Sequence, residues 1–276
     1  MSNQSNYSLD ELAKLKIHFI GVGGAGMSGI ARIMLAKGFS ISGSDKNDSA
    51  MLTSLKALGA EVFVGHAAEN LGSAQLVIIS SAISESNAEL IAAKAKGLPI
   101  VARATALAWL MSESTSVAIA GTHGKTTTTA MLTVALQSAG LDPSFAIGGT
   151  INTAGTNAHS GTGKIFVAEA DESDGSFLAY KPNGAIITNI ELDHVDHFPN
   201  EAAVFAVFEQ FVSSIKQGGF LVACGDDVGV KTLLKRLTRK DLQIHLYGKS
   251  ANNDFLEGCI SWGNSDLIFV YWFGQI

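Results

Sequence analysis

The sequence predicts an α/β protein with two domains, each built on a parallel β-sheet. Short apolar runs that suit strands alternate along the chain with stretches of helical spacing, and this order indicates βαβ units with helices on both faces of a sheet. Two glycine-rich loops, Gly21–Gly26 and Gly121–Thr126, each follow a strand-like run and precede a helix-compatible run. A chain of 276 residues with 47% apolar and 16% charged residues can form two ordinary domains with large cores.

The composition argues against several classes of function. The net charge of −6 disfavours nucleic acid or an anionic membrane as the main partner, although backbone amides can still bind phosphate. Cys224 and Cys259 make neither a disulfide framework nor a metal cluster. The first ten residues are polar, without the apolar core of a signal peptide, and no apolar run reaches the roughly 18 residues that span a bilayer. We therefore expect a soluble, cytoplasmic protein.

The first glycine loop matches a dinucleotide-binding pattern. Ile17–Gly21 is a short buried-strand pattern, Gly21–Gly26 reads G-x-G-x-x-G, and Met27–Lys37 has helical spacing. Phe39–Asp45 is a second strand that ends in an acid, 19 residues after the last glycine. Taken alone, these features predict a Rossmann-like parallel-sheet N-terminal domain that holds a pyrophosphate. The motif by itself is weak, because an ordinary glycine turn can also pack a helix against a strand.

A polar break separates two sets of alternating strands and helices. The first set ends at Met111, and the break follows at Ser112–Ser116. We place the domain boundary at this break, so that residues 1–112 form the first domain and residues 113–255 form a P-loop α/β central domain. The remaining residues, 256–276, are predicted to be an atypical tail, which leaves the central domain incomplete.

The second glycine loop has the layout of a phosphate-binding loop. Val117–Ala120 is an apolar strand pattern, and the glycines after it allow backbone N–H groups to close around phosphate oxygens. Lys125 can reach the outer phosphates, and the Thr126 hydroxyl can ligate Mg²⁺. The full pattern needs a glycine at the position of Ile119, five residues before Gly124, so this loop is a shortened form. The alternative is an ordinary strand–helix turn.

Acidic residues follow two later strands of the second domain. Ile165–Asp174 is a strand that ends in four acids, and Ala185–Ile190 is a strand that continues into Glu191–His197. Gly155–His159 is predicted to be a loop rich in Gly, Thr and Asn. The ligand crevice of an open parallel sheet lies outside the carboxyl ends of its strands, where four side chains can converge: Lys125, Thr126, Glu169 and His194. A carboxylate and a neutral imidazole there suit Mg²⁺ or Mn²⁺, although the alternative for the other acids of the first run is a solvated turn.

Together these stretches resemble the Mur ligases, the ATP-dependent amide-forming enzymes of peptidoglycan synthesis. The resemblance covers roughly residues 15–250, and its motifs occur in the family's order. They are Ile17–Ala31, Ser42–Asp45, Ser80–Ile83, Ala120–Thr129, Ala168–Asp174 and Thr188–His194. The shortened phosphate loop is the family's own form.

The resemblance implies a binding site in each domain. The first-domain loop would hold the diphosphate of UDP-N-acetylmuramate, and the implied substrate contacts are Gly23, Gly24, Ala25, Gly26, Met27, Asp45, Ser81, Thr156 and Asn157. The implied ATP contacts are Gly121, Thr122, His123, Gly124, Lys125, Thr126, Thr127 and Asn189. The implied Mg²⁺ ligands are Thr126, Glu169 and His194, and the implied catalytic residues are Lys125, Glu169 and His194.

The implied reaction has two steps. A muramyl carboxylate attacks the γ-phosphate of ATP to give an acyl phosphate, and the amine of L-alanine then displaces phosphate to leave an amide. Catalysis would rest on positioning and on charge neutralisation by Lys125 and the metal ions. The Gly-Gly-Ala-Gly-Met-Ser-Gly run at 23–29 favours the family member that adds L-alanine over the member that attaches a tripeptide during wall recycling.

The chain departs from the family in its later part. The family has a third domain that binds the amino acid and a His-Asn-x-x-Asn segment late in the central domain, and neither is found in this sequence. The resemblance fades after about Asp254, so we expect a truncated or frame-shifted form of the ligase. Two other hypotheses stay open: a non-catalytic UDP-sugar-binding fragment, and an NAD-dependent oxidoreductase built on Gly21–Gly26 and Asp45. The second of these leaves the loop at Lys125 unexplained.

Overall fold

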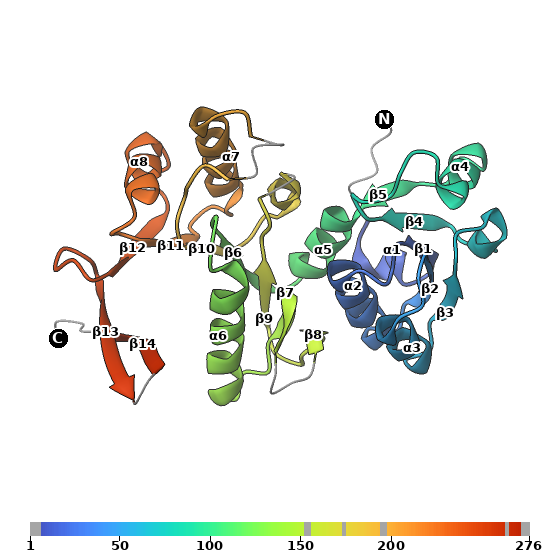
Figure 1. Cartoon of the computed structure of the whole chain (residues 1–276), viewed down its shortest axis with the longest axis horizontal. Helices are drawn as coiled ribbons and strands as arrows, with labels where there is room; N and C mark the ends of the chain where they lie inside the picture. Colours follow the sequence, from blue (N-terminus) through green and yellow to red (C-terminus); the bar gives the residue numbers. More distant parts are fainter. Residues whose placement is uncertain (1–6, 152–155, 173–174, 194–197, 263–264, 272–276) are drawn as a thin grey trace. The chain divides into compact units, whose positions relative to one another are not determined.

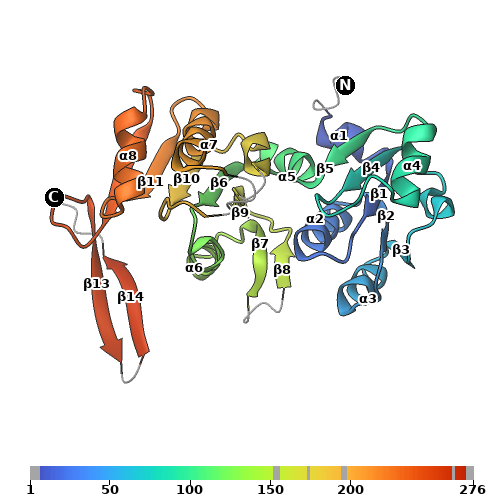
Figure 2. The ribbon, with the colours of Figure 1, turned by 45° about the horizontal axis from the view of Figure 1, so that its top comes forward.

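A computed structural model describes residues 7–151, 156–172, 175–193, 198–262 and 265–271. It confirms the predicted α/β class, with parallel strand pairing in each part of the chain (Figure 1, Figure 2). The chain divides into two compact units, Met1–Ser114 with Ala130–Val167, and Thr115–Thr129 with Ala168–Ile276. The domain boundary at residue 112 stays a prediction. None of the described helices is long and apolar enough to cross a membrane.

The first unit contains a five-stranded parallel sheet with the strand order β3-β2-β1-β4-β5. Its strands are β1 (Lys16–Ile20), β2 (Ser40–Asp45), β3 (Glu61–Val64), β4 (Leu76–Ile79) and β5 (Ile100–Ala102). Its helices are α1 (Leu9–Leu12), α2 (Ala25–Ala36), α3 (Ala50–Ala57), η1 (Ala68–Leu71), α4 (Ala88–Ala95) and α5 (Arg103–Ser112). The central strand β1 is buried after its first residue, as a strand with neighbours on both sides and covered faces requires. Its polar exception is His18, whose side chain is fully buried.

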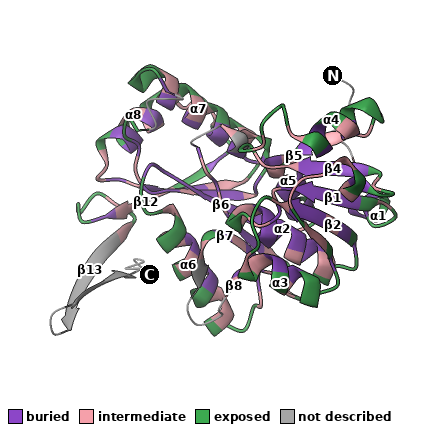
Figure 3. Cartoon of the chain, turned by 45° about the vertical axis from the view of Figure 1, so that its right-hand side comes forward, coloured by how far each residue is buried: buried purple, intermediate pink, exposed green. Residues whose placement is uncertain are grey.

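Helical spacing and capping explain two helices that border the glycine loop and its pocket. Helix α2 starts after Gly24 and buries Met27, Ile30, Ile33 and Met34, which recur every three or four residues and so line one face. Helix α4 starts at an asparagine cap, because the Asn87 side chain accepts hydrogen bonds from the two N–H groups of Glu89 and Leu90. Figure 3 shows β1, β2 and β4 of this unit as largely buried, with exposed residues along the outer sides of the helices. Strand β3 at the sheet edge has no buried residue.

A hairpin, β7 (Ser144–Ile151) with β8 (Thr156–His159), also belongs to the first unit. The two strands pair antiparallel, with Phe145 opposite His159 and Ala146 opposite Ala158. The prediction of a loop at residues 155–159 is therefore wrong for 156–159, while Gly155 lies outside the described residues. Composition misled the prediction, because the polar residues of this stretch gain their order from pairing with β7 rather than from a β-forming sequence.

The second unit carries a sheet with the strand order β14-β13-β12-β11-β10-β6-β9. Its strands are β6 (Thr115–Ala120), β9 (Ile165–Glu169), β10 (Gly184–Ile187), β11 (Phe220–Cys224), β12 (Gln243–Gly248), β13 (Phe255–Trp262) and β14 (Ser265–Tyr271). Its helices are α6 (Lys125–Ser138, which continues into the first unit), η2 (Ser176–Ala179), α7 (Glu201–Ser214) and α8 (Val228–Arg236). The pairs β6–β10, β10–β11 and β11–β12 are parallel, so their carboxyl ends lie at one edge. Under this sheet Phe177 stacks on Phe211 with ring centroids 4.6 Å apart.

Candidate functional site

The phosphate loop joins β6 to α6 through two glycines that an L-residue could not easily replace. Gly121 has φ = 135° and Gly124 has φ = 82°, and such positive values are unfavourable for residues with a Cβ. A Cβ on Gly121 would also lie 2.0 Å from Thr188 Oγ1. The glycine thus lets the end of β10 approach the loop backbone at close range.

Residues that follow β10 hold the phosphate loop in place. The Thr188 hydroxyl donates to the His123 carbonyl over 2.6 Å. The Asn189 side chain accepts from His123 N at 2.8 Å and donates to His123 O at 3.1 Å, and Thr122 N donates to Asn189 O at 3.0 Å. In the structure Asn189 therefore fixes the loop backbone, and its contact with a nucleotide stays a prediction.

The Lys125 ammonium lies inside the loop and faces a buried carboxylate. Its Nζ donates to Gly121 O at 2.8 Å, to Thr122 O at 3.1 Å and to Glu172 Oε1 at 3.0 Å. The Glu172 side chain is only 3% exposed, so the solvated-turn alternative fails for this acid. Burial raises the pKa of Glu172 more than the hydrogen bond and charge of Lys125 lower it. Glu172 is a part of the site that the sequence did not single out.

Thr126 and Glu169 form the second contact of the loop. The Thr126 hydroxyl donates to Glu169 Oε1 over 2.8 Å, which brings together two of the three predicted metal ligands. The third, His194, lies outside the described residues. Within the described ranges no group of three or more His, Cys, Asp or Glu side chains is placed to hold a metal ion. The hydroxyl and the carboxylate still supply the hard oxygen donors that Mg²⁺ prefers.

The start of α6 completes an anion site. The first N–H groups of a helix have no partner within it, and here they belong to Lys125, Thr126 and Thr127. Thr128 N is the first to bond back into the turn, to Gly124 O at 2.9 Å. Amide dipoles at a helix N-terminus, one lysine ammonium and one Thr–Glu oxygen pair together make an environment for a phosphorylated ligand with a divalent cation.

The glycine loop of the first unit is closed by Asp45. Gly23 N donates to Asp45 Oδ2 at 2.9 Å, and a Cβ on Gly23 would lie 2.8 Å from Asp45 Cγ. Gly21 has φ = 85°. The predicted substrate contact Asp45 therefore fixes the loop itself, through an N–H group that the turn presents to it.

A cavity of about 460 Å³ opens beside this loop. Its lining residues are Gly21, Gly24, Asp45, Lys46, His66, Ser80, Ala82, Ile83, Ser84, Ser86 and Asn87. They come from the carboxyl ends of β1, β2, β3 and β4 and from the start of α4, where ligands bind in parallel sheets. Ser81 is exposed and is not among the lining residues, whereas its neighbour Ser80 is. His66 and Lys46 belong to no motif, so neither residue could be predicted as a cavity residue from the sequence.

The start of α2 presents backbone rather than side chains to this region. Gly24 and Ala25 are exposed, whereas Met27 is 2% exposed and points into the core. A Cβ on Gly26 would lie 2.4 Å from Arg103 Nη1, so the helix start also has a guanidinium beside it, which the sequence did not suggest. Any contact of Met27 with a ligand would therefore use its backbone N–H group.

Asn157 of β8 supports the same helix start, whereas the side chain of its neighbour Thr156 bonds within β8. Asn157 is 2% exposed, and its Nδ2 donates to Ala25 O at 2.6 Å. The Thr156 hydroxyl donates to Ala158 O at 2.9 Å. Asn157 thus holds the first turn of α2 in position, and the predicted substrate contacts of both residues stay predictions.

The fold and the two glycine loops define a class of α/β protein in which each unit presents a helix N-terminus suited to a phosphate group. Comparison with protein families narrows this class. The sequence pattern of the Mur ligase family, catalytic domain, matches residues 16–115, and that of the Mur ligase middle domain matches residues 119–266. The chain therefore belongs to the Mur ligase family, which confirms the resemblance.

Two curated relatives carry the same name. A UDP-N-acetylmuramate–L-alanine ligase from Renibacterium salmoninarum is 55% identical over 236 residues, which cover 86% of this chain and 51% of that protein. The ligase of that name from Saccharopolyspora erythraea is 51% identical over 243 residues, which cover 87% of this chain and 50% of that protein. The chain thus spans about half the length of the curated relatives it matches.

Solved structures give the same family. The UDP-N-acetylmuramate:L-alanyl-γ-D-glutamyl-meso-diaminopimelate ligase from Neisseria meningitides superposes with a TM-score of 0.81 at 29% identity, covering 94% of this chain and 84% of that one. The UDP-N-acetylmuramate–alanine ligase from Thermotoga maritima superposes with a TM-score of 0.76 at 29% identity, covering 88% of this chain and 54% of that one.

Proposed function

We propose that this chain carries the two nucleotide-binding parts of an ATP-dependent ligase that joins L-alanine to UDP-N-acetylmuramate in peptidoglycan synthesis. The observation that supports this most is the phosphate loop, in which the Lys125 ammonium donates to Gly121 O and the Thr126 hydroxyl donates to Glu169. The proposed substrates are those in the names of the curated relatives, which are identical to this chain at about half of the aligned positions. On this proposal the protein acts in the cytoplasm.

ATP binds at the phosphate loop on this proposal. The N–H groups at the start of α6 and the Lys125 ammonium hold the phosphates, and Gly121 to Thr127 with Asn189 form the surrounding loop. Thr126, Glu169 and His194 would hold Mg²⁺, which neutralises charge on the transferring phosphate when bound. Two of these three residues already contact each other, so the donor set fits a hard cation.

Lys125 has to exchange partners when ATP arrives. In the structure its ammonium is held by two carbonyl oxygens and Glu172, and a phosphate oxygen would replace at least one of them. The bound muramyl carboxylate then attacks the γ-phosphorus as the bond to ADP breaks. The alanine amine attacks the acyl carbon, phosphate leaves with one carboxylate oxygen, and the amine loses a proton. The residues of this chain contribute position and positive charge rather than covalent chemistry.

UDP-N-acetylmuramate binds at the glycine loop on this proposal. The diphosphate would meet the backbone of Gly23, Gly24, Ala25, Gly26 and Met27 at the start of α2, and the nucleoside would enter the adjoining cavity. Asp45 supports the loop and Asn157 supports the helix, and Thr156 and Ser81 are proposed as further substrate contacts. Both amide-rich loops would thus bind phosphate, each with its own nucleotide.

The sister ligase that attaches a tripeptide is the second candidate function. It is favoured by the Neisseria structure, of which this chain covers 84%. The alanine-adding function is preferred because the relatives with that name are about half identical to this chain, against 29% for the tripeptide ligase. A UDP-sugar-binding protein without turnover remains the third.

Calorimetric titration of the chain tests the proposal. We expect separate binding of UDP-N-acetylmuramate and of Mg·ATP, and no binding of NAD. Binding of UDP-N-acetylmuramate without ATP would favour the sugar-binding alternative. NAD binding in place of the UDP-sugar would overturn the ligase assignment and restore the oxidoreductase hypothesis.

A further inference from the structure

A fully buried carboxylate lies beneath the cavity of the first unit. Glu89, in the first turn of α4, is 0% exposed. One of its oxygens, Oε1, accepts from Asn70 Nδ2 at 2.6 Å and from Ala67 N at 3.3 Å. The other, Oε2, accepts from the Ser44 hydroxyl at 2.5 Å and lies 3.4 Å from both His18 Nε2 and His66 Nδ1. A buried charge needs such a set of donors to be tolerated, so this network is built around an ionised Glu89.

The network holds Glu89 ionised. Burial raises the pKa of Glu89, but hydrogen bonds from His18, Ser44 and Asn70 outweigh it and lower the pKa to about 2. The carboxylate therefore acts only as an acceptor at neutral pH. Every group that faces it has to donate.

This requirement fixes the direction of each hydrogen bond around Ser44. Its hydroxyl has one hydrogen, and Glu89 takes it. Ser44 Oγ also lies 2.9 Å from His66 Nδ1, so His66 Nδ1 has to carry the proton and donate to Ser44. In a neutral imidazole the other nitrogen, Nε2, is then an acceptor. His18 is oriented by the same rule, with Nε2–H toward Glu89 and Nδ1 facing the Ser42 hydroxyl at 2.9 Å.

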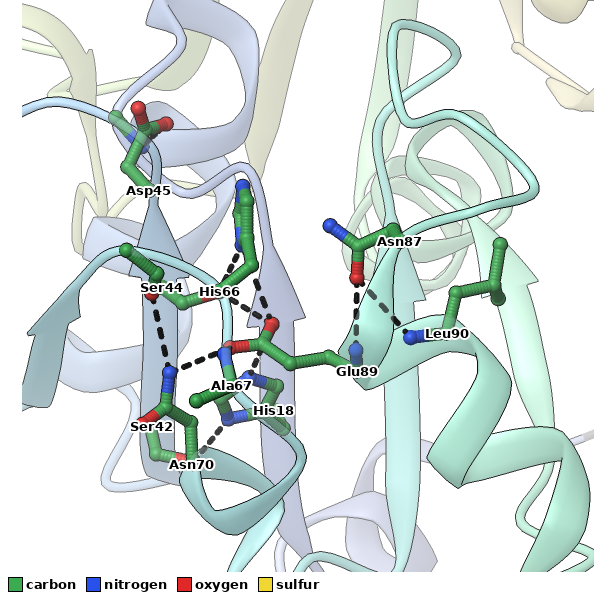
Figure 4. Close-up of polar contacts among 12 residues, drawn as sticks. His18, Ser42, Ser44, Asp45, His66, Ala67, Asn70, Asn87, Glu89 and Leu90 are labelled. Atoms are coloured by element: carbon green, nitrogen blue, oxygen red, sulfur yellow. Dashed lines mark hydrogen bonds and ion pairs between the residues drawn. The ribbon is translucent and has the colours of Figure 1, made fainter.

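The acceptor nitrogen of His66 faces the cavity side of the network. Figure 4 shows the second ring nitrogen turned away from Glu89, on the side where Asp45 lies. His66 and Asp45 both line the cavity beside the glycine loop, and the His66 side chain is 19% exposed. An acceptor at this place repels phosphate oxygens, which are acceptors themselves. It attracts a ligand group that donates, such as a nucleoside hydroxyl or the imide N–H of a pyrimidine.

We propose that Glu89 is a positioning residue for this cavity: through Ser44 it holds His66 in the Nδ1–H form, so that Nε2 accepts a hydrogen bond from the nucleoside of the bound UDP-sugar. The contact with the nucleoside rests on the proposed function of the glycine loop. The hydrogen-bond relay from Glu89 through Ser44 to His66 is a property of the free protein.

Glu89→Gln tests the hydrogen-bond relay and the ligand contact separately, because an amide can reverse the direction of the hydrogen bonds in the relay. If the new NH₂ group faces Ser44, it donates to Ser44 Oγ, and the Ser44 hydroxyl then donates to His66 Nδ1. The proton of His66 moves to Nε2, which now presents a donor to the cavity. The side-chain oxygen still accepts from Asn70 and Ala67. The same NH₂ group faces His18 Nε2, so the proton of His18 moves to Nδ1, which then donates to Ser42. The shape of the network is kept, and only the direction of its hydrogen bonds changes.

The first test measures which ring nitrogen of His66 carries the proton in the absence of any ligand. Long-range ¹H–¹⁵N spectra of the full chain distinguish the protonated from the unprotonated ring nitrogen, and His66→Asn assigns the resonances of this ring. We expect Nδ1–H in the wild type and Nε2–H in Glu89→Gln. A wild-type spectrum with Nε2–H would overturn the proposal, even if the variant failed to fold.

The second test measures the affinity of the chain for its proposed ligand and for parts of it. Calorimetric titrations use UDP-N-acetylmuramate, UDP and inorganic pyrophosphate, with Glu113→Gln, an exposed residue of the same unit, as the matched control. We expect Glu89→Gln to weaken both uridine ligands by about tenfold, the scale of one lost hydrogen bond and one misplaced donor, with pyrophosphate and the control unchanged.

The outcomes distinguish a failure of the proposed relay from a failure of the proposed function. Equal weakening of pyrophosphate would place the effect on the glycine loop and overturn the proposal, as would unchanged affinity in a variant whose tautomer has reversed. If the wild type bound none of the uridine ligands, the proposed function would fail, while the spectra would still decide the relay.

Discussion

The two glycine loops use the same backbone arrangement with different side chains. Each follows a buried strand, places a helix N-terminus at the carboxyl edge of a parallel sheet, and has a carboxylate close by. In the phosphate loop that carboxylate contacts a threonine hydroxyl, and Lys125 is held beside it. In the glycine loop the carboxylate of Asp45 accepts a backbone N–H group, and no lysine follows the glycines. Amide groups can face phosphate in both loops, and Arg103 and Lys46 lie near the glycine loop. Of the two loops, the phosphate loop is the one that carries a lysine within it and a Thr–Glu oxygen pair suited to a divalent cation.

Lys125→Ala gives the largest expected effect, because it removes the one ammonium inside the phosphate loop. We expect Mg·ATP affinity to fall by about a hundredfold, because a hydrogen bond to a charged group contributes about 1.5–3 kcal/mol, and turnover of the complete ligase to be abolished. UDP-sugar affinity should stay at the wild-type value. Calorimetry with both ligands measures this, with the exposed Lys181→Ala as control. Near-normal ATP binding or ligation would remove Lys125 from its proposed role.

Gly121→Ala tests the close approach of β10 to the loop. The added Cβ would meet Thr188 Oγ1 and would hold alanine at φ = 135°, so we expect a loss of about 2–4 kcal/mol in unfolding free energy. Denaturant unfolding measures the loss, and ATP affinity should fall with it. Gly140→Ala is the matched comparison, because Gly140 has φ = 75° with no atom near its absent Cβ. Equal losses of unfolding free energy in the two variants would mean that the contact with Thr188 does not affect stability.

Asp45→Ala breaks the corresponding clamp of the first unit. It leaves Gly23 N without its acceptor, which costs about 1–3 kcal/mol when a polar group loses its partner. We expect the affinity for UDP-N-acetylmuramate to fall about tenfold, since the loop is less well ordered, while Mg·ATP affinity is unchanged. A variant that lost ATP and kept the UDP-sugar would contradict the assignment of the two loops.

Glu89 and Glu172, one buried carboxylate in each unit, should respond to pH in opposite ways. The pKa of Glu89 is lowered from 4.5 to about 2, so its stabilisation is complete above pH 4.5 and is lost as pH falls toward 2. The shift corresponds to about 3 kcal/mol. The pKa of Glu172 is raised by burial, so its contribution is present below pH 4.5 and is lost as pH rises through the folded pKa.

Unfolding free energies measured from pH 2.5 to 7 test this contrast. Glu89→Gln should flatten the loss of stability on acidification, and Glu172→Gln should remove a loss on the alkaline side of pH 4.5. The same direction of change for both variants would contradict the structure. The expected effect for Glu172 is the smallest of the series, because Lys125 offsets part of the burial.

Local sequence was sufficient for the class of fold and for much of the phosphate loop. The apolar runs before Gly21 and Gly121 and the helical spacing after them identify both loops, because each signal lies within a few residues. Thr126 and Glu169 could be paired before the structure was known, since both follow strands of a parallel sheet whose carboxyl ends share one edge. His194 lies outside the described residues, so its part in that site stays a prediction.

Contacts between distant residues could not be predicted in this way. Asn157 bonds to Ala25 across 132 positions, and the strand that carries it has the composition of a loop. The sequence left open whether Glu172 is a solvated acid, because its burial depends on how the segment after β9 folds back on Lys125. His18, Ser44 and Glu89 belong to three different elements, and no motif spacing links them. Tertiary packing, rather than propensity, decides each of these positions.

We propose that the chain holds two separate nucleotide sites, one for a UDP-sugar and one for ATP. A calorimetric titration of Mg·ATP into the chain already saturated with UDP-N-acetylmuramate tests this. We expect ATP to bind with one site per chain without displacing the UDP-sugar. Displacement of the UDP-sugar by ATP would mean that the two nucleotides share one site, and the proposal of two sites would be wrong.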